Sequence, residues 1–166
     1  MPSATRIAVA IAATVGLAGC IPRFLGNQPL ARPLDLKSER ADLPSGARLL
    51  IYEQPGESQV HVSVSYLGGS AEDPVGKEGL SHLAAHTTYQ ARDESGATLR
   101  QRLLAESASF WVATDADITT FESAGHPAQV ATLLAIEADR MREPLARVGT
   151  AELAAEQRIV AGEAQS

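Results

Sequence analysis

The sequence predicts an α+β domain in which helices pack on one face of a mostly antiparallel sheet. Apolar and polar residues alternate from Val60 to Tyr66, which indicates a half-buried strand. Two runs rich in Thr, Phe, Val and Ile, residues 110–114 and 117–123, predict a hairpin. Strands paired in hairpins and helices clustered along the chain are typical of this fold class.

The other elements follow from local patterns. A turn at residues 43–46 precedes an expected strand over residues 47–53. Pro127 favours the start of a helix, because proline is well tolerated in a first turn, and Pro144 ends it. The expected helices are residues 79–90, residues 98–105, one that starts at Pro127 and one that begins near Thr150.

Composition bounds the class of protein. The chain has 166 residues, 45% of them hydrophobic, which is enough for one domain and too few for two ordinary ones. Its formal net charge is -6, no Lys/Arg cluster interrupts the acidic balance, and aromatic residues make up 4%. We therefore expect no nucleic-acid partner.

Residues 1–19 are predicted to be a lipoprotein signal peptide. Arg6 precedes an apolar run, residues 7–18, that suits a leader core and is too short to span a bilayer. The run ends in Leu-Ala-Gly-Cys, which resembles a bacterial lipobox and implies lipidation of Cys20. The alternative is an ordinary secretory leader with a chance cysteine.

The lipobox resemblance implies that Cys20 anchors the protein to a membrane through several acyl chains. Residue 21 is Ile rather than Asp, which by similarity to known lipoproteins favours the outer membrane, facing the periplasm. Residues 20–42 contain several prolines and are expected to be the lipidated cysteine and a tether. Residues 43–166 remain as the domain.

Two histidines stand four residues apart on a predicted helix. His82 and His86 therefore share one face and can bind one metal ion, although the pair alone is a weak signal. On the last predicted helix Glu156 and Glu163 are seven residues apart and also share a face. His82, His86 and Glu163 would make a His-His-Glu zinc site; the alternative is that both glutamates are solvated surface residues.

The segment Gly76–His86 resembles the signature helix of the pitrilysin/insulinase family, whose inverted zinc motif is H-x-x-E-H. Residues 114–121 resemble the family's T-x-x-D-x-T-x-Y hairpin, and residues 137–141 its next helix. Between the second histidine and the third ligand the family has 76 residues, which leads here to Glu163. The resemblance covers residues 43–166 and implies part of a zinc peptidase domain with one zinc ion.

Ala85 is the main departure from the family. It stands where the family has the glutamate that takes a proton from the attacking water, and a methyl group accepts no proton. Loss of such a group costs roughly 10²–10⁴-fold in rate. Glu78, one turn earlier, is not expected to replace it. Glu156 matches a second family glutamate and is expected to orient the zinc ligands.

Two further departures concern substrate binding. Trp111 stands where the family has an asparagine on the strand that pairs with substrate; the alternative is a packed aromatic. The sequence ends three residues after Glu163, whereas family peptidases have a longer domain and a second homologous half. The remaining histidines, His61 and His126, are expected to be structural or exposed.

These observations predict an insulinase-family lipoprotein that keeps its zinc ligands, is impaired or inactive as a peptidase, and pairs with an active homologous subunit. A peptide is expected to be bound without being cleaved. Three alternatives stay open: a truncated remnant, a lipid-anchored scaffold or binding protein without metal, and a zinc endopeptidase that uses an unusual base.

Overall fold

The computed structural model describes residues 7–11 and 37–164. Its strands form one sheet in the order β2-β3-β1-β4-β6-β5. Neighbouring strands are antiparallel except β1 and β3, which are parallel. The strands are β1 (Ile7–Ile11), β2 (Lys37–Asp42), β3 (Arg48–Glu53), β4 (Val60–Tyr66), β5 (Ser109–Thr114) and β6 (Thr119–Gly125).

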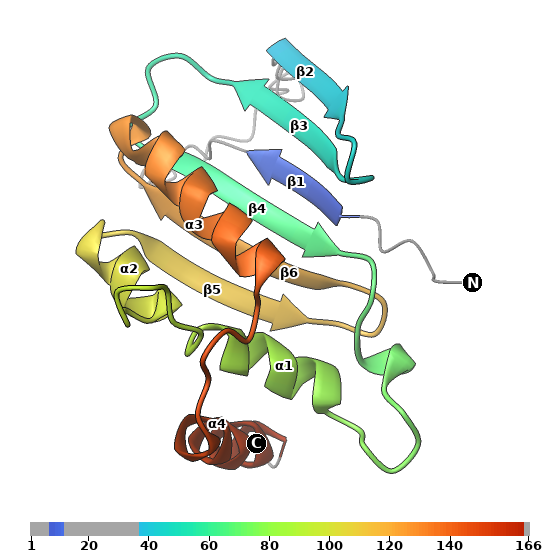
Figure 1. The fold of residues 1–166 in the computed structure, drawn as a ribbon. Helices are drawn as coiled ribbons and strands as arrows, with labels where there is room; N and C mark the ends of the chain where they lie inside the picture. Colours follow the sequence, from blue (N-terminus) through green and yellow to red (C-terminus); the bar gives the residue numbers. More distant parts are fainter. Residues whose placement is uncertain (1–6, 12–36, 165–166) are drawn as a thin grey trace, which may run out of the picture.

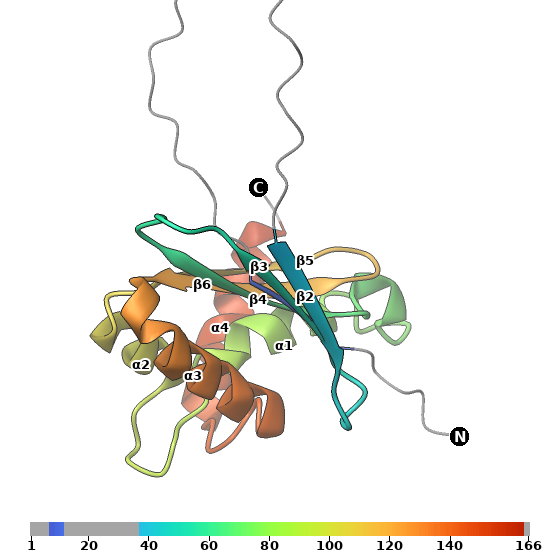
Figure 2. The same cartoon turned by 90° about the horizontal axis from the view of Figure 1, so that it is seen from above.

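The helices lie on one face of this sheet, as Figures 1 and 2 show from two directions. The α-helices are α1 (Leu80–Thr88), α2 (Leu99–Ala105), α3 (Val130–Arg142) and α4 (Thr150–Glu163), with short 3-10 turns at η1 (Ser70–Glu72) and η2 (Pro127–Gln129). Helix α4 packs against α1, beyond the edge of the sheet that β5 forms (Figures 1 and 2). The predicted fold class, α+β with a mostly antiparallel sheet, is confirmed.

Strand β4 forms the centre of the core. Its inward residues Val62 and Val64 are fully buried, and its outward ones are polar, as the alternation predicts. Seven residues of β4 pair with β6, and Val64 stands opposite Phe121. The helices add Leu103 and Leu133, which are both buried in the same layer. The predicted strand and hairpin are therefore confirmed.

Hydrogen bonds at the helix starts explain where α2 and η2 begin. Thr98 accepts from the backbone of Gln101, whose side chain accepts from the backbone of Thr98, a reciprocal cap. The helix expected from Pro127 begins as η2 and continues as α3. His126 precedes it and accepts from the backbone N–H of Ala128 at 3.2 Å, so this histidine has a structural role, as expected.

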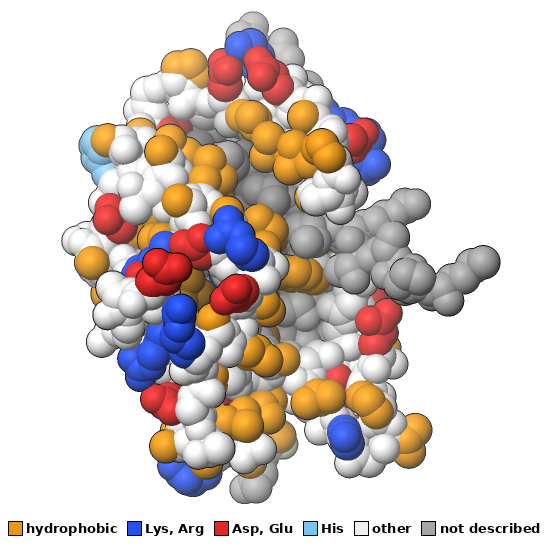
Figure 3. Space-filling view, in the orientation of Figure 1, with side chains coloured by type: hydrophobic (Ala, Val, Ile, Leu, Met, Phe, Trp, Pro, Cys, Tyr) orange, Lys and Arg blue, Asp and Glu red, His pale blue; other side chains and the backbone are white. Residues whose placement is uncertain are grey.

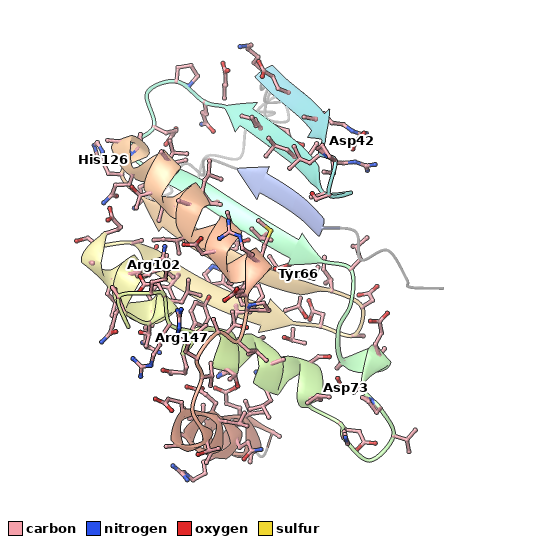
Figure 4. All side chains as sticks on the ribbon, viewed as in Figure 1. Asp42, Tyr66, Asp73, Arg102, His126 and Arg147 are labelled. Atoms are coloured by element: carbon pink, nitrogen blue, oxygen red, sulfur yellow. The ribbon has the colours of Figure 1, made fainter. Side chains whose placement is uncertain are left out.

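A buried arginine of α3 ties this helix to the sheet and pairs with a glutamate of the same helix. The Arg140 guanidinium donates to Glu137 and to the Tyr66 hydroxyl, and its carbon lies 3.7 Å from the centre of the Phe121 ring. Burial raises the pKa of Glu137, although Arg140 opposes that change. Figure 4 shows Tyr66 at the end of β4 beside α3.

The expected tether, residues 20–42, stays a prediction, and the structure describes only its last six residues. Lys37–Asp42 forms β2, an edge strand that pairs with β3. Residues 12–36 lie outside the described part of the chain. All six residues of β2 are exposed, so no apolar alternation marked the strand. Charged pairs across the two strands accompany it, Lys37 with Glu53 at 3.0 Å and Arg48 with Asp42 at 3.1 Å.

Strand β1 falls inside the predicted signal peptide and lies between β3 and β4. Signal-peptide cleavage stays a prediction, as does lipidation, because Cys20 lies outside the described residues. Within residues 7–11 and 37–164, no helix is both long and apolar enough to cross a membrane.

Candidate metal centre

Helix α1 carries both histidines, and an aspartate from the preceding loop fixes its start. Gly79, the residue before the helix, has φ of 90° and offers no capping side chain. Asp73 supplies the missing acceptor, at 2.7 Å from the Gly79 N–H and 2.9 Å from the Ser81 N–H. The Ser81 hydroxyl also donates to Asp73 and, with these amides, holds the pKa of the carboxyl below its usual range. Figure 4 labels Asp73 beside the start of α1.

Helix α4 brings a carboxylate to the two imidazoles. The Nε2 atoms of His82 and His86 are 3.1 Å apart. Glu163 Oε2 lies 3.3 Å from His82 Nε2 and 3.5 Å from His86 Nε2. The structure thus brings together all three residues that the sequence predicted as zinc ligands, as a group in which each offers one ligand atom.

These distances fit the geometry of zinc. Zinc bonds to nitrogen and oxygen are about 2.0–2.1 Å long, so the ligand atoms of a tetrahedral site are about 3.3 Å apart. The three separations, 3.1, 3.3 and 3.5 Å, match that spacing. The side chains of His82 and Glu163 are 37% and 49% exposed, so the group opens to solvent on one side. Three protein ligands with an open fourth position characterise catalytic rather than structural zinc sites.

Glu156 contacts His86 on the side of the ring away from Glu163. Its Oε2 lies 3.4 Å from His86 Nδ1, the ring nitrogen that does not approach Glu163 Oε2, and its Oε1 accepts from Gln90 at 2.7 Å. Glu156 is 7% exposed, so Gln90 and His86 provide polar partners for a buried carboxylate. A proton held on Nδ1 toward Glu156 leaves the lone pair of Nε2 for a metal. The orienting role that the resemblance implies for Glu156 stays a prediction.

Sequence reasoning missed Gln90 as part of this arrangement. It follows His86 by four residues and lies just beyond the end of α1. The four-residue spacing was the only signal in the sequence, and by itself it does not indicate a partner 66 residues away on α4.

The position of the family's general base is filled by a core methyl group. Ala85 is 3% exposed and belongs to the apolar cluster that also contains Tyr89 and Leu103. The Glu78 carboxylate accepts a hydrogen bond from the Gly76 N–H, which lowers the pKa of Glu78. Glu156 lies behind His86. Both glutamates thus have other polar partners, Glu78 the Gly76 N–H and Glu156 the side chains of His86 and Gln90.

Trp111 lies on β5, which pairs only with β6 and forms one edge of the described sheet. Its neighbours Phe110 and Val112 pack against the core, whereas Trp111 is 51% exposed. It is therefore not a core aromatic.

Fold and side chains together define a metallopeptidase-like domain with a His-His-Glu group on two packed helices. The sequence model of the insulinase family, peptidase family M16, matches residues 48–165. The chain belongs to this family. No curated protein sequence matches it.

Two solved structures share the fold. The crystal structure of pitrilysin aligns with a TM-score of 0.58 and 20% identity over 63% of this chain. A protease from Helicobacter pylori aligns with a TM-score of 0.66 and 21% identity over 77% of this chain. The chain spans 11% of the pitrilysin chain and 30% of the Helicobacter protease chain, so it corresponds to a small part of each.

Proposed function

We propose that the protein is a zinc-binding but catalytically impaired member of the insulinase family, which is held on a membrane by a lipidated Cys20 and works beside a competent homologous subunit. One observation carries the proposal: a converging His-His-Glu group stands next to a base position that is filled by Ala85. The ligand geometry supports metal binding, whereas the missing base argues against efficient peptide hydrolysis.

When bound, zinc would supply a Lewis acid that polarises a peptide carbonyl. His82, His86 and Glu163 would hold it, and Glu156 would keep the ring of His86 turned toward it. The chain lacks a side chain at residue 85 that accepts a proton. A peptide at the open side of the group would thus be bound and polarised without being cleaved at a useful rate.

Zinc stoichiometry is the first test. Elemental analysis of the purified lipoprotein should give about one zinc per chain, as a three-ligand site on one domain requires. His82→Ala should remove it, while His126→Ala, which lies at the start of α3, should not. Equal zinc content in both variants would show that another site holds the metal.

Ala85→Glu tests the reason for impairment. Restoring a base should raise cleavage of an unstructured peptide by roughly 10²-fold or more, if Ala85 is the main defect. The gain should disappear on chelation and in the double variant with His82→Ala. Strong cleavage by the unmodified chain would contradict the proposal and favour an unusual base.

The membrane and partner assignments rest on the leader and on the family. Cys20→Ser should move the protein from the detergent phase to the aqueous phase and block lipid labelling. Peptidase activity of a homologous subunit should rise when this chain is added, and Glu163→Ala should show whether that effect needs the metal group. Unchanged activity of that subunit would remove the support for pairing.

A further inference from the structure

The turn of the β5–β6 hairpin packs against the segment that leads into helix α1. Two consecutive N–H groups of η1, at Ser70 and Ala71, donate to two consecutive carbonyl oxygens of the turn at 2.9 and 2.8 Å. The accepting residues are Asp115 and Ala116, which directly follow β5. This contact therefore joins the edge strand of the described sheet to the loop before the helix that carries both histidines.

Gly69 allows the two segments to approach each other so closely. It is buried, and a Cβ atom in its place would overlap the carbonyl oxygen of Asp115 and lie 2.9 Å from the carbonyl carbon of Ala116. Both atoms belong to the main chain of the turn, so they cannot rotate away as the end of a side chain can. The backbone of Gly69 is extended, with φ of -159°, so the close approach, and not a left-handed conformation, requires glycine here.

The carbonyl group of Gly69 is bonded to helix α1. The Ser81 hydroxyl, in the first turn of the helix, donates to this carbonyl oxygen at 3.1 Å. The next residue of the helix is His82, which belongs to the candidate metal group. Gly69 thus contacts the hairpin turn on one side and the start of the metal helix on the other.

Apolar contacts also hold α1 against β5, but they specify its position along the strand less strictly. Tyr89 packs on Phe110 with ring centres 5.2 Å apart, and Ala85 adds only a methyl group to the same cluster. Attraction between apolar surfaces has no preferred direction, whereas hydrogen bonds depend on distance and angle. The contact at Gly69 should therefore fix where the start of α1 lies relative to β5.

We infer that Gly69 is a positioning residue, whose missing side chain sets where α1, and with it the His-His-Glu group, lies along the edge strand β5. The part that concerns the metal rests on the proposed function. Helix α4, which supplies Glu163, packs on α1, so the three ligands should move together when α1 moves. A larger residue at position 69 should therefore shift the metal relative to β5 and still leave it bound.

Trp111 makes this displacement measurable. It is the only tryptophan of the chain and lies on β5, so energy transfer from its indole to bound Co²⁺ reports the distance between the strand and the metal. In the full-length lipoprotein, Gly69→Ala should shift the transfer efficiency while about one Co²⁺ stays bound per chain. Gly68→Ala is the matched control and should leave the efficiency unchanged, because the Cβ atom added there meets the flexible side chain of Glu72 instead of backbone.

Ser81 provides a second pair of variants that does not depend on how Gly69→Ala folds. Ser81→Ala removes the hydroxyl that donates to Gly69 and should also shift the transfer efficiency. The Ser81 N–H still donates to Asp73 in this variant, so the start of α1 stays capped. Ser81→Thr keeps a hydroxyl and should match the unmodified protein, which a general loss of stability at this position would not explain.

A measurement without metal separates this inference from the proposed function. In a full-length Cys20→Ser/Glu163→Cys chain, an acceptor dye on residue 163 takes the place of the ion, and Trp111 is again the donor. The side chain of Glu163 is 49% exposed, so a thiol there can be labelled. Gly69→Ala should shift the transfer efficiency in this chain as well.

The possible results decide between the two proposals. No metal in the unmodified protein, together with a shifted dye distance in Gly69→Ala, would reject the metal site and leave the positioning role standing. Metal bound in both glycine variants, with equal transfer efficiencies in Gly69→Ala and Gly68→Ala, would overturn the positioning role and leave Gly69 as a packing residue. If Gly69→Ala does not fold, equal efficiencies in Ser81→Ala and Ser81→Thr would overturn it.

Discussion

Glu156 shows how a single side chain can control the metal group without touching the ion. We predict that Glu156→Gln lowers zinc affinity by about 10–100-fold, because the amide no longer stabilises a proton on Nδ1 of His86. Competition with a chromogenic chelator measures the change. Glu152→Gln is the matched control, since Glu152 is on the same helix and pairs with Arg92. Equal affinities of the two variants would contradict the orienting role.

At the level of single residues, the sequence predicted the metal ligands but not the residues that hydrogen-bond to their helices and side chains. His82, His86 and Glu163 follow from spacing and family resemblance, because ligand positions on helices recur at fixed intervals. Asp73 and Gln90 act through hydrogen bonds whose partners depend on the path of a loop and on how α4 meets α1. Such partners have no periodic signature in the sequence.

Helix α1 depends on a cap that comes from outside the helix. We predict that Asp73→Asn destabilises the protein at neutral pH and weakens zinc binding, because the charged acceptor at the start of α1 is lost. The folded pKa of Asp73 is lowered, chiefly by the Ser81 hydroxyl, from the usual 3.8. Its stabilising contribution is therefore present above that value and is lost as pH falls through the folded pKa.

Thermal unfolding of Asp73→Asn and of the unmodified protein should accordingly differ most near pH 7 and converge in acid. Asp117→Asn is the control with the same change of charge, placed in the exposed turn between β5 and β6. A difference that persists unchanged at low pH would show that the charge of Asp73 does not contribute.

Elements with one apolar face were predictable from the sequence. The exposed strand β2, and strand β1 within the predicted leader, were not. Strand β4 and the β5–β6 hairpin have one buried side, so burial imposes a period of two on the sequence. Strand β2 is exposed throughout and carries no such pattern. Strand β1 lies in an apolar run that also satisfies the requirements of a signal peptide, and composition alone does not separate these two uses.

Arg140 pairs with Glu137 on the same helix and joins α3 to the sheet through Tyr66 and Phe121. We predict that Arg140→Met lowers the free energy of unfolding by about 3–5 kcal/mol, since it leaves Glu137 buried without a cation. Chemical denaturation measures this loss. The double variant Arg140→Met/Glu137→Leu should recover much of it, because both desolvated charges are gone. Additive losses would show that the pair is not coupled.

Charged side chains of both signs are mixed on one face of the molecule. On the face shown in Figure 3, basic side chains lie among acidic ones, without an unbroken basic area. Ion pairs account for part of this mixture, among them Arg102 and Arg142, which both contact Asp139.

Metal binding should also decide how firmly α4 is held. Its main packing partner is α1, and the three residues of the metal group lie across that contact, two on α1 and one on α4. Zinc binds the folded arrangement and not the unfolded chain, so it should stabilise the protein by mass action.

We predict that chelation lowers the melting temperature and speeds hydrogen exchange in α4 before it affects β4 and β6. Glu163→Ala should show the fast exchange in α4 with or without the chelator, which distinguishes loss of the metal link from a general effect of the chelator. Uniform acceleration across the sheet and α4 would mean that the metal supports the whole domain instead of this one helix contact.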